Sequence, residues 1–217
     1  MGAYTLIIGS KNYSSWSLRG WLAMRQTGAA FEEVLVPFHT AERSALIRRH
    51  SPSGLVPVLR DGDLLINDSL AIAEYLAERH PEARLWPEDP SARAMARAAA
   101  AEMHSGFGAL RAALPMNFRL VRSGPERSAA VDADVGRITE IWGGCRAAHG
   151  AEGPFLFGPF TVADAMYAPV VSRLRTYRVP VDAVSQAYMD TVWAHPWLRE
   201  WGQGAAGEPP IEKYDAI

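Results

Sequence analysis

Cysteine is almost absent from this chain: Cys145 is the only one among 217 residues. A single cysteine excludes an intrachain disulfide bond and any Cys-x-x-Cys motif, so disulfide oxidoreductase chemistry is excluded with them. Cys145 falls in a segment whose pattern predicts a helix, where a cysteine more often serves as a small core residue than as a nucleophile. We therefore expect Cys145 to be buried.

A strong excess of charge of one sign is also absent. The formal net charge is −2 at pH 7, so neither nucleic acid nor an anionic membrane surface is expected as a partner. No apolar run approaches the length of a membrane span, and the first twenty residues lack the pattern of a signal peptide. Apolar residues make up 48% and charged residues 21%, an ordinary globular balance. We expect a soluble, cytoplasmic protein that binds no metal ion.

The first eighty residues alternate between strand and helix patterns. Short apolar runs bounded by turn residues predict strands, and amphipathic runs predict helices. Strands are expected at 4–9, 31–37, 56–59 and 64–66, and helices at 15–27, at 41–50 and from Asp68-Ser69 to about His80. The order is βαβαββα. Its βαβ unit requires parallel pairing with a right-handed crossover, and the turn at Asp61-Gly62-Asp63 predicts an antiparallel hairpin.

Residues 81–91 contain three prolines and predict a linker. Only helical patterns follow it, at 91–114 with a soft spot at Gly106 and Gly108, at 126–149, at 161–177, at 183–194 and at 196–202. The third of these opens on Thr161-Val162-Ala163-Asp164, a capping box with Asp in place of Glu. The predicted fold class is therefore an α+β N-terminal domain (1–80) and, after the linker, an all-α domain (92–217).

Hydroxyl side chains gather where the first strand passes into the first helix, in Ser14-Ser15-Trp16-Ser17-Leu18-Arg19. The first turn of a helix offers unpaired N–H groups and the positive end of the helix dipole. A serine there could be only the N-cap. It could also donate to an anion such as a thiolate, because the pKa of a thiol falls at a helix N-terminus.

Four segments resemble the soluble glutathione transferases over nearly the whole chain. Residues 14–19 are similar to the Ser-Ser-Cys-Ser-x-Arg signature of the zeta class, a serine-type class, with Trp16 in place of cysteine. The others are Ser51-Pro52-Ser53-Gly54-Leu55-Val56-Pro57-Val58-Leu59, similar to Asn-Pro-x-Gly-x-Val-Pro-x-Leu, then Asn67-Asp68-Ser69-Leu70-Ala71-Ile72, and the capping box at 161–164. The resemblance implies a thioredoxin-like N-terminal domain with glutathione as co-substrate, and a helical domain that lines the electrophile site.

The same resemblance implies how glutathione binds. Val56 would present its backbone N–H and C=O to the cysteinyl unit, next to a cis Pro57. Ser69 would hold the γ-glutamyl carboxylate at a helix N-terminus, which favours anions. Asp68 stands where the family usually has Glu or Gln, and would face the ligand ammonium. His50 is the candidate for the glycyl carboxylate, because the usual basic position is a leucine here.

Activation of the thiol is assigned to a serine. Lowering its pKa by about two units from about 8.5 requires about 2.7 kcal/mol of preferential stabilisation. A hydrogen bond to a charged acceptor supplies about 1.5–3 kcal/mol and a helix N-terminus about 0.3–1 kcal/mol, so one serine at this turn suffices. The zeta resemblance favours Ser14 as the donor, with Ser15 as the second candidate.

The electrophile pocket is assigned to six residues on both sides of the expected domain boundary: Trp16, Arg19, His104, Phe107, Met116 and Asn117. Structural alternatives remain for several of them. Trp16 and His104 could pack between the domains, and Arg19 could pair with an acid of the helical domain. Two further arginines, Arg173 and Arg175, could attract an anionic substrate or be surface charges. The tryptophans at 193, 197 and 201 are interpreted as packing.

Three functions remain open at this point. The first is conjugation of glutathione to a small hydrophobic electrophile, with dehalogenation or peroxide reduction as variants of the same thiolate chemistry. The second is a zeta-like, glutathione-dependent cis–trans isomerase acting on maleylacetoacetate, although Trp16 replaces the zeta cysteine. The third is a non-catalytic interaction protein with the transferase fold. The resemblance also implies a homodimer.

Overall fold

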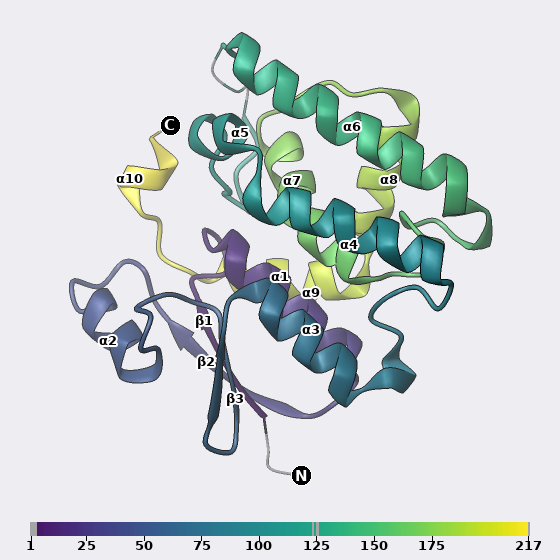
Figure 1. Cartoon of the computed structure of the whole chain (residues 1–217). Helices are drawn as coiled ribbons and strands as arrows, with labels where there is room; N and C mark the ends of the chain where they lie inside the picture. Colours follow the sequence, from purple (N-terminus) through teal and green to yellow (C-terminus); the bar gives the residue numbers. More distant parts are fainter. Residues whose placement is uncertain (1–3, 123, 125, 217) are drawn as a thin grey trace.

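A computed structural model describes residues 4–122, 124 and 126–216 (Figure 1). The N-terminal part contains a four-stranded sheet with the order β2-β1-β3-β4. Its strands are β1 (Tyr4–Gly9), β2 (Phe31–Val36), β3 (Val58–Asp61) and β4 (Leu64–Asn67). β1 pairs in parallel with β2 and antiparallel with β3, which forms the hairpin with β4. The predicted βαβαββα order is confirmed, including the parallel unit and the hairpin.

Both faces of β1 are buried, which explains its uninterrupted apolar run. Leu6 and Ile8 lie in the main core with residues of α1 (Ser15–Gln26) and α3 (Ser69–Arg79). Ile7, with the opposite side-chain direction, packs with Ile47 of α2 (Arg43–His50) in a second cluster. Helices therefore cover both faces, and α1 and α3 lie between the sheet and the rest of the chain (Figure 1).

The remainder of the described chain is helical, as predicted. Its elements are η1 (Pro81–Ala83), α4 (Pro90–Ser105), α5 (Gly108–Ala113), α6 (Ala129–His149), η2 (Gly150–Glu152), α7 (Val162–Thr176), α8 (Ala183–Ala194), α9 (Pro196–Ala206) and α10 (Glu212–Asp215). α7 is buried along nearly its whole length and packs against α1, α4 and α8. Cys145 and Trp201 are buried in this core, as expected, and Trp193 and Trp197 pack against it.

Two helix predictions need correction. The single helix expected at 91–114 is broken, because Phe107 adopts a left-handed backbone with φ +60° and Arg111 Nε donates to the Gly106 carbonyl oxygen over 2.9 Å. The soft spot is thus a complete end of α4. The helix expected at 196–202 continues to Ala206 and includes Gly202. This glycine serves packing, because a Cβ at that position would lie 2.9 Å from the Phe118 ring. Close packing against this ring therefore requires a glycine at position 202. The short helix α10 was not expected from the sequence.

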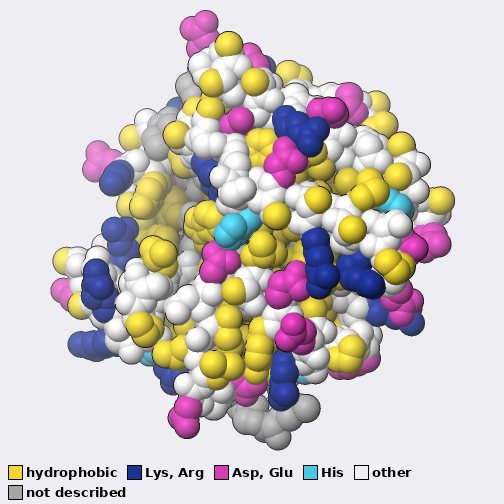
Figure 2. All heavy atoms as spheres, viewed as in Figure 1, with side chains coloured by type: hydrophobic (Ala, Val, Ile, Leu, Met, Phe, Trp, Pro, Cys, Tyr) yellow, Lys and Arg dark blue, Asp and Glu magenta, His cyan; other side chains and the backbone are white. Residues whose placement is uncertain are grey.

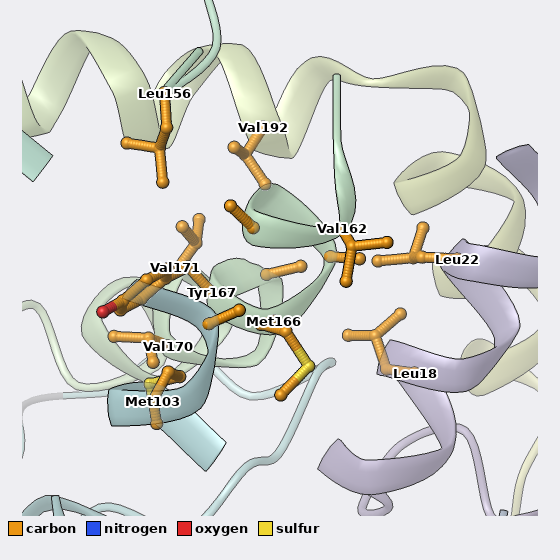
Figure 3. Packing of buried hydrophobic residues seen from close by; sticks show 14 of the residues in the cluster. Leu18, Leu22, Met103, Leu156, Val162, Met166, Tyr167, Val170, Val171 and Val192 are labelled. Atoms are coloured by element: carbon orange, nitrogen blue, oxygen red, sulfur yellow. The ribbon is translucent and has the colours of Figure 1, made fainter. Parts of the chain in front are cut away.

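The two halves meet along α1 and α7. Leu18 and Leu22 point from α1 toward Val162 and Met166 of α7 (Figure 3), and all four are buried. α7 begins at the predicted capping box, in which the Thr161 amide donates to Asp164 Oδ2 over 2.8 Å. The helix α1, which has Ser14, Ser15 and Ser17 at its start, is thereby fixed against the helical half.

Candidate functional site

The N-termini of α1 and α3 lie close together beside α4, since Trp16 and Asp68 both contact His104. Pro57 lies between the two helices, since a Cβ on Gly20 of α1 would be 2.9 Å from Pro57 Cγ and 3.9 Å from Ile72 Cδ1 of α3. The Val56–Pro57 peptide bond is cis, as the resemblance implied. Figure 2 shows the face above these helices hollowed between the region of α2 and the region of α4 and α5.

Three predicted residues from three helical elements meet at this place. Asp68 caps α3 by accepting from the Leu70 amide over 2.8 Å. Its other carboxylate oxygen lies 3.2 Å from His104 Nε2 on α4. The His104 ring meets the Trp16 ring edge-on at 5.2 Å between centroids. The structure therefore brings Trp16, Asp68 and His104 together.

Ser14 and Ser15 have different hydrogen-bond roles. Ser14 Oγ is the N-cap of α1: it accepts from the Ser17 amide over 3.3 Å and donates its proton to Ser17 Oγ over 2.8 Å. Ser17 Oγ in turn accepts from the Gly9 amide over 2.9 Å. Ser15 Oγ accepts from Arg173 Nη2 over 3.3 Å, which leaves its own proton uncommitted among the described residues. Both serines are buried.

Three arginines surround this serine turn. Arg19 Cζ lies 4.5 Å and Arg111 Cζ 4.9 Å from the centroid of the Trp16 ring, and Arg173 contacts Ser15. We call Arg19, Arg111 and Arg173 the arginine cluster. None of the three forms an ion pair with any residue that the structure describes. The cluster is thus a concentration of positive charge at the start of α1.

The surroundings of the arginine cluster lower the pKa of each of its three arginines. Burial lowers the pKa of Arg19 well below its usual value, and the charges of Arg111 and Arg173 lower it further. The Arg173 pKa falls to about 10 through burial and then through repulsion by Arg111. Nη1 and Nη2 of Arg19 are buried without a hydrogen-bond partner in the described chain. Unpaired buried charge is destabilising, so this cluster favours the arrival of an anion.

Ser69 offers a second place for an anion. It is the first residue of α3 and is 1% exposed. Within the described residues its Oγ has no hydrogen-bond partner. A hydroxyl without a partner at a helix N-terminus is suited to a carboxylate, which can accept both from the hydroxyl and from the first-turn amides.

Other predicted residues lie in the core or in a separate network. Phe107 and Met116 are buried in the main hydrophobic cluster. Asn117 is 2% exposed, donates to Asp215 Oδ1 over 2.6 Å and accepts from the Asn12 side chain. His50 ends α2, and among the described residues no hydrogen bond or ion pair joins it to the other candidates. A contact of these four with substrate stays a prediction.

Arg19 and Arg173 differ from their sequence-based interpretations. Arg19 contacts the helical half through a hydrogen bond from Nε to the Met166 carbonyl oxygen, 3.1 Å, and not through an acid. Arg175 pairs with Asp190 near the surface, as expected, but the surface interpretation is wrong for Arg173, which is buried. Arg111 was not foreseen. Its only sequence signal is its position shortly after Gly106 and Gly108, in the segment that the structure shows as α5.

Comparisons with known proteins agree with this geometry. Residues 13–79 match the family "Glutathione S-transferase, N-terminal domain". Glutathione S-transferase GstB of Escherichia coli (strain K12) is 29% identical over 168 residues, which cover 75% of this chain and 74% of that protein. Residues 13–79 thus carry a glutathione S-transferase N-terminal domain, and the chain is similar to a glutathione S-transferase over three quarters of its length. A thioredoxin-like domain followed by helices, as described above, is also the fold of the glutathione transferases.

Two further matches are a probable isomerase and a theta class transferase. A probable maleylacetoacetate isomerase of Caenorhabditis elegans is 36% identical over 93 residues, 43% of this chain and 42% of that protein. The chain spans less than half the length of the five curated relatives that it matches at 36% identity or more. The structure of the theta class glutathione S-transferase from Xanthomonas axonopodis pv. citri, with glutathione bound, superposes with a TM-score of 0.63 at 26% identity and covers 94% of this chain and 98% of that one.

Among the described residues, no helix combines the length and the apolar character needed to cross a membrane.

Proposed function

We propose that this transferase-family chain binds glutathione, converts its thiol to the thiolate and adds the sulfur to a small hydrophobic electrophile. The observation that carries the proposal is the buried Ser69 hydroxyl, which has no partner among the described residues, at the N-terminus of α3. It matches a carboxylate, and glutathione carries two. The glutathione-bound theta class relative supports the same ligand.

In the proposed binding mode, three residues of the N-terminal half contact glutathione. Val56 pairs through its backbone with the cysteinyl unit, and the Ser69 hydroxyl with the first-turn amides holds the γ-glutamyl carboxylate. Asp68 Oδ2 already lies 3.2 Å from His104 Nε2, so this carboxylate is shared between His104 and the γ-glutamyl ammonium. In the chemical step the thiol gives its proton to water. The sulfur then forms a bond to carbon, while the leaving group departs with the electron pair of its own bond.

Ser15 is the proposed hydrogen-bond donor to the sulfur. The Ser14 proton is committed to Ser17 Oγ, whereas the Ser15 oxygen accepts from Arg173 and its proton is available. Donation from Ser15 with the α1 N-terminus supplies about 2–4 kcal/mol of preference for the thiolate. This is enough for a fall of about two units in the thiol pKa.

The test is the pKa of the glutathione thiol in the complex, measured from the thiolate absorbance of enzyme titrated with pH. We expect a depressed pKa in the wild-type enzyme, recovery of one unit or more toward about 8.5 in Ser15→Ala, and a smaller change in Ser14→Ala. A larger recovery in Ser14→Ala would assign the donor to Ser14. Glutathione binding with an unshifted thiol would support a non-catalytic protein instead.

A second candidate function is glutathione-dependent cis–trans isomerisation of maleylacetoacetate. It is favoured by the 36% identity over 93 residues to a probable maleylacetoacetate isomerase. Conversion of maleylacetoacetate to its trans isomer without consumption of glutathione would establish it. Failure of that assay, together with conjugation of a model electrophile, would leave the transferase.

Two properties typical of the family accompany the proposal. We infer a homodimer and a cytoplasmic location, both by analogy with relatives. A single species with the mass of one chain in sedimentation velocity would contradict the dimer.

A further inference from the structure

We propose that Arg173 of α7 is a positioning residue for thiolate formation: it holds the Ser15 oxygen so that the Ser15 proton is directed to the sulfur of bound glutathione. The inference rests on the proposed function and deepens it. It assigns to the helical half of the chain a direct part in activating the thiol, which is bound by the other half.

The first argument is the fixed direction of the Arg173 side chain. Its Nε donates to the Leu114 carbonyl oxygen over 2.9 Å, and its Nη1 lies 3.5 Å from the Pro169 carbonyl oxygen. These contacts hold the planar guanidinium, so the remaining donor, Nη2, meets Ser15 Oγ at 3.3 Å. A hydroxyl that accepts from a cation becomes a better donor through its own proton. Ser15 is therefore polarised in the direction that a thiolate requires.

The second argument is the charge around the contact. Arg111 of α5 and Arg19 of α1 lie near Arg173, and the three cations repel one another. The charges of Arg111 and Arg173 lower the pKa of Arg19, and the charge of Arg111 lowers the pKa of Arg173. The acidic groups that face them are Asp134, whose charge acts on Arg111 without an ion pair, Asp68, which is 3.2 Å from His104, and the neutral phenols of Tyr167 and Tyr177. Because no carboxylate pairs with the arginine cluster in the described chain, a thiolate at Ser15 is the anion that relieves the repulsion.

The third argument separates a positioning role from a purely structural one. An arginine that only tied α7 to the end of α5 would need the carbonyl of Leu114 and no serine. Arg173 instead donates one hydrogen bond to the Ser15 side chain in the other half of the molecule, 158 positions away in sequence. Opposite charges within about 4–6 Å change a pKa by about 1–3 units. With Ser15 as the intermediate, the lower end of that range is expected.

The experiment measures the thiol pKa of bound glutathione in Arg173→Met, in Arg173→Lys and in Ser15→Ala with and without Arg173→Met. We expect Arg173→Met to raise the bound thiol pKa by about one unit, which lowers the thiolate fraction about tenfold below that pKa. Lysine keeps the charge but lacks the fork that serves Leu114 and Ser15 together, so an intermediate value is expected. Arg175→Met, on the same helix and paired with Asp190, is the matched control and should leave the thiol unchanged.

The double variant decides whether Arg173 acts through Ser15. In the Ser15→Ala background, Arg173→Met should move the thiol pKa by less than half of its effect in the wild type. An equal shift in both backgrounds overturns the positioning role, as does a folded Arg173→Met enzyme whose bound thiol titrates like that of the wild type. If Arg173→Met does not fold, Arg173→Lys decides, and a wild-type thiol pKa in that variant also overturns the proposal.

Calorimetry with S-methylglutathione, which has no thiol, keeps the two proposals apart. Its binding to wild type and to Arg173→Met with similar affinity is expected, because Arg173 acts on the sulfur and not on the carboxylates. Absence of binding to the wild-type chain would overturn the proposed function and this inference together. Binding with an unchanged thiol pKa in Arg173→Met would overturn the role of Arg173 alone.

Discussion

Replacement of Asp164 by asparagine is expected to change how the stability of this protein depends on pH. Asp164 is fully buried at the start of α7. Its Oδ2 accepts from the Thr161 amide and hydroxyl, and its Oδ1 from the Leu156 amide and the Tyr188 hydroxyl. Burial nevertheless dominates these four contacts and raises the Asp164 pKa from 3.8 to about 6.

The sign and the size follow from that shift. Because the folded-state pKa lies above the unfolded value, the contribution of Asp164 to stability is fully present below pH 3.8 and is lost as the pH rises through about 6. A shift of about two units corresponds to about 3 kcal/mol in total, of which about 1.4 kcal/mol is lost between about pH 5 and pH 7.5. Asparagine does not titrate, so the difference between the two proteins isolates this one group.

Urea unfolding of the wild type and Asp164→Asn at several pH values between about 5 and 7.5 measures the difference. The wild type should be the more stable at pH 5, since the amide leaves one backbone N–H without an acceptor at about 1–3 kcal/mol. The advantage should shrink by about 1.4 kcal/mol at pH 7.5. A difference that is constant across the range, or that grows with pH, would refute a carboxyl whose pKa is raised by burial.

Three shorter predictions concern the candidate site. Ser69→Ala should weaken glutathione binding about tenfold or more in calorimetry, because it removes a hydrogen bond to a charged carboxylate, and unchanged affinity would move the carboxylate elsewhere. Arg19→Met should leave the melting temperature unchanged or higher, since a buried unpaired charge is exchanged for apolar volume; a large fall would show that Arg19 is a structural anchor. Asp215→Ala removes the acceptor of the Tyr13 hydroxyl and the Asn117 amide, and should speed hydrogen exchange in residues 10–13, whereas unchanged exchange would contradict this anchoring.

The sequence was informative where local chemistry and tertiary structure agree. The apolar run of β1, the cap at Asp68 and the capping box at Thr161 each reflect a local rule, and each appears in the structure at the expected place. The break at Phe107 and the continuation of α9 through Gly202 do not follow from local rules. One depends on a guanidinium from the next helix, and the other on the Phe118 ring packed against the glycine.

The candidate site was foreseen unevenly for the same reason. Ser14, Ser15 and Ser69 lie at helix starts, which periodicity can locate, and the family resemblance then implied roles for them and for Asp68. Arg173 was named with Arg175 as a possible attractor of an anionic substrate, but its inward direction could not be predicted, because α7 is buried on nearly all sides and no face of it is marked as polar. In such a helix the spacing of apolar residues does not distinguish an arginine that reaches the surface, such as Arg175, from one that points inward.

The buried position of α7 also bears on how the site keeps its shape. A mobile surface arginine would lose side-chain entropy on each encounter with the serine, whereas Arg173 is already ordered by the Leu114 and Pro169 carbonyls. Leu18 and Leu22 fix α1 against the same helix (Figure 3). The distance from Arg173 to Ser15 therefore depends on apolar packing between the two halves. Under the proposed mechanism, we expect a loss of that packing to alter the pKa of the bound thiol without any change in a polar residue.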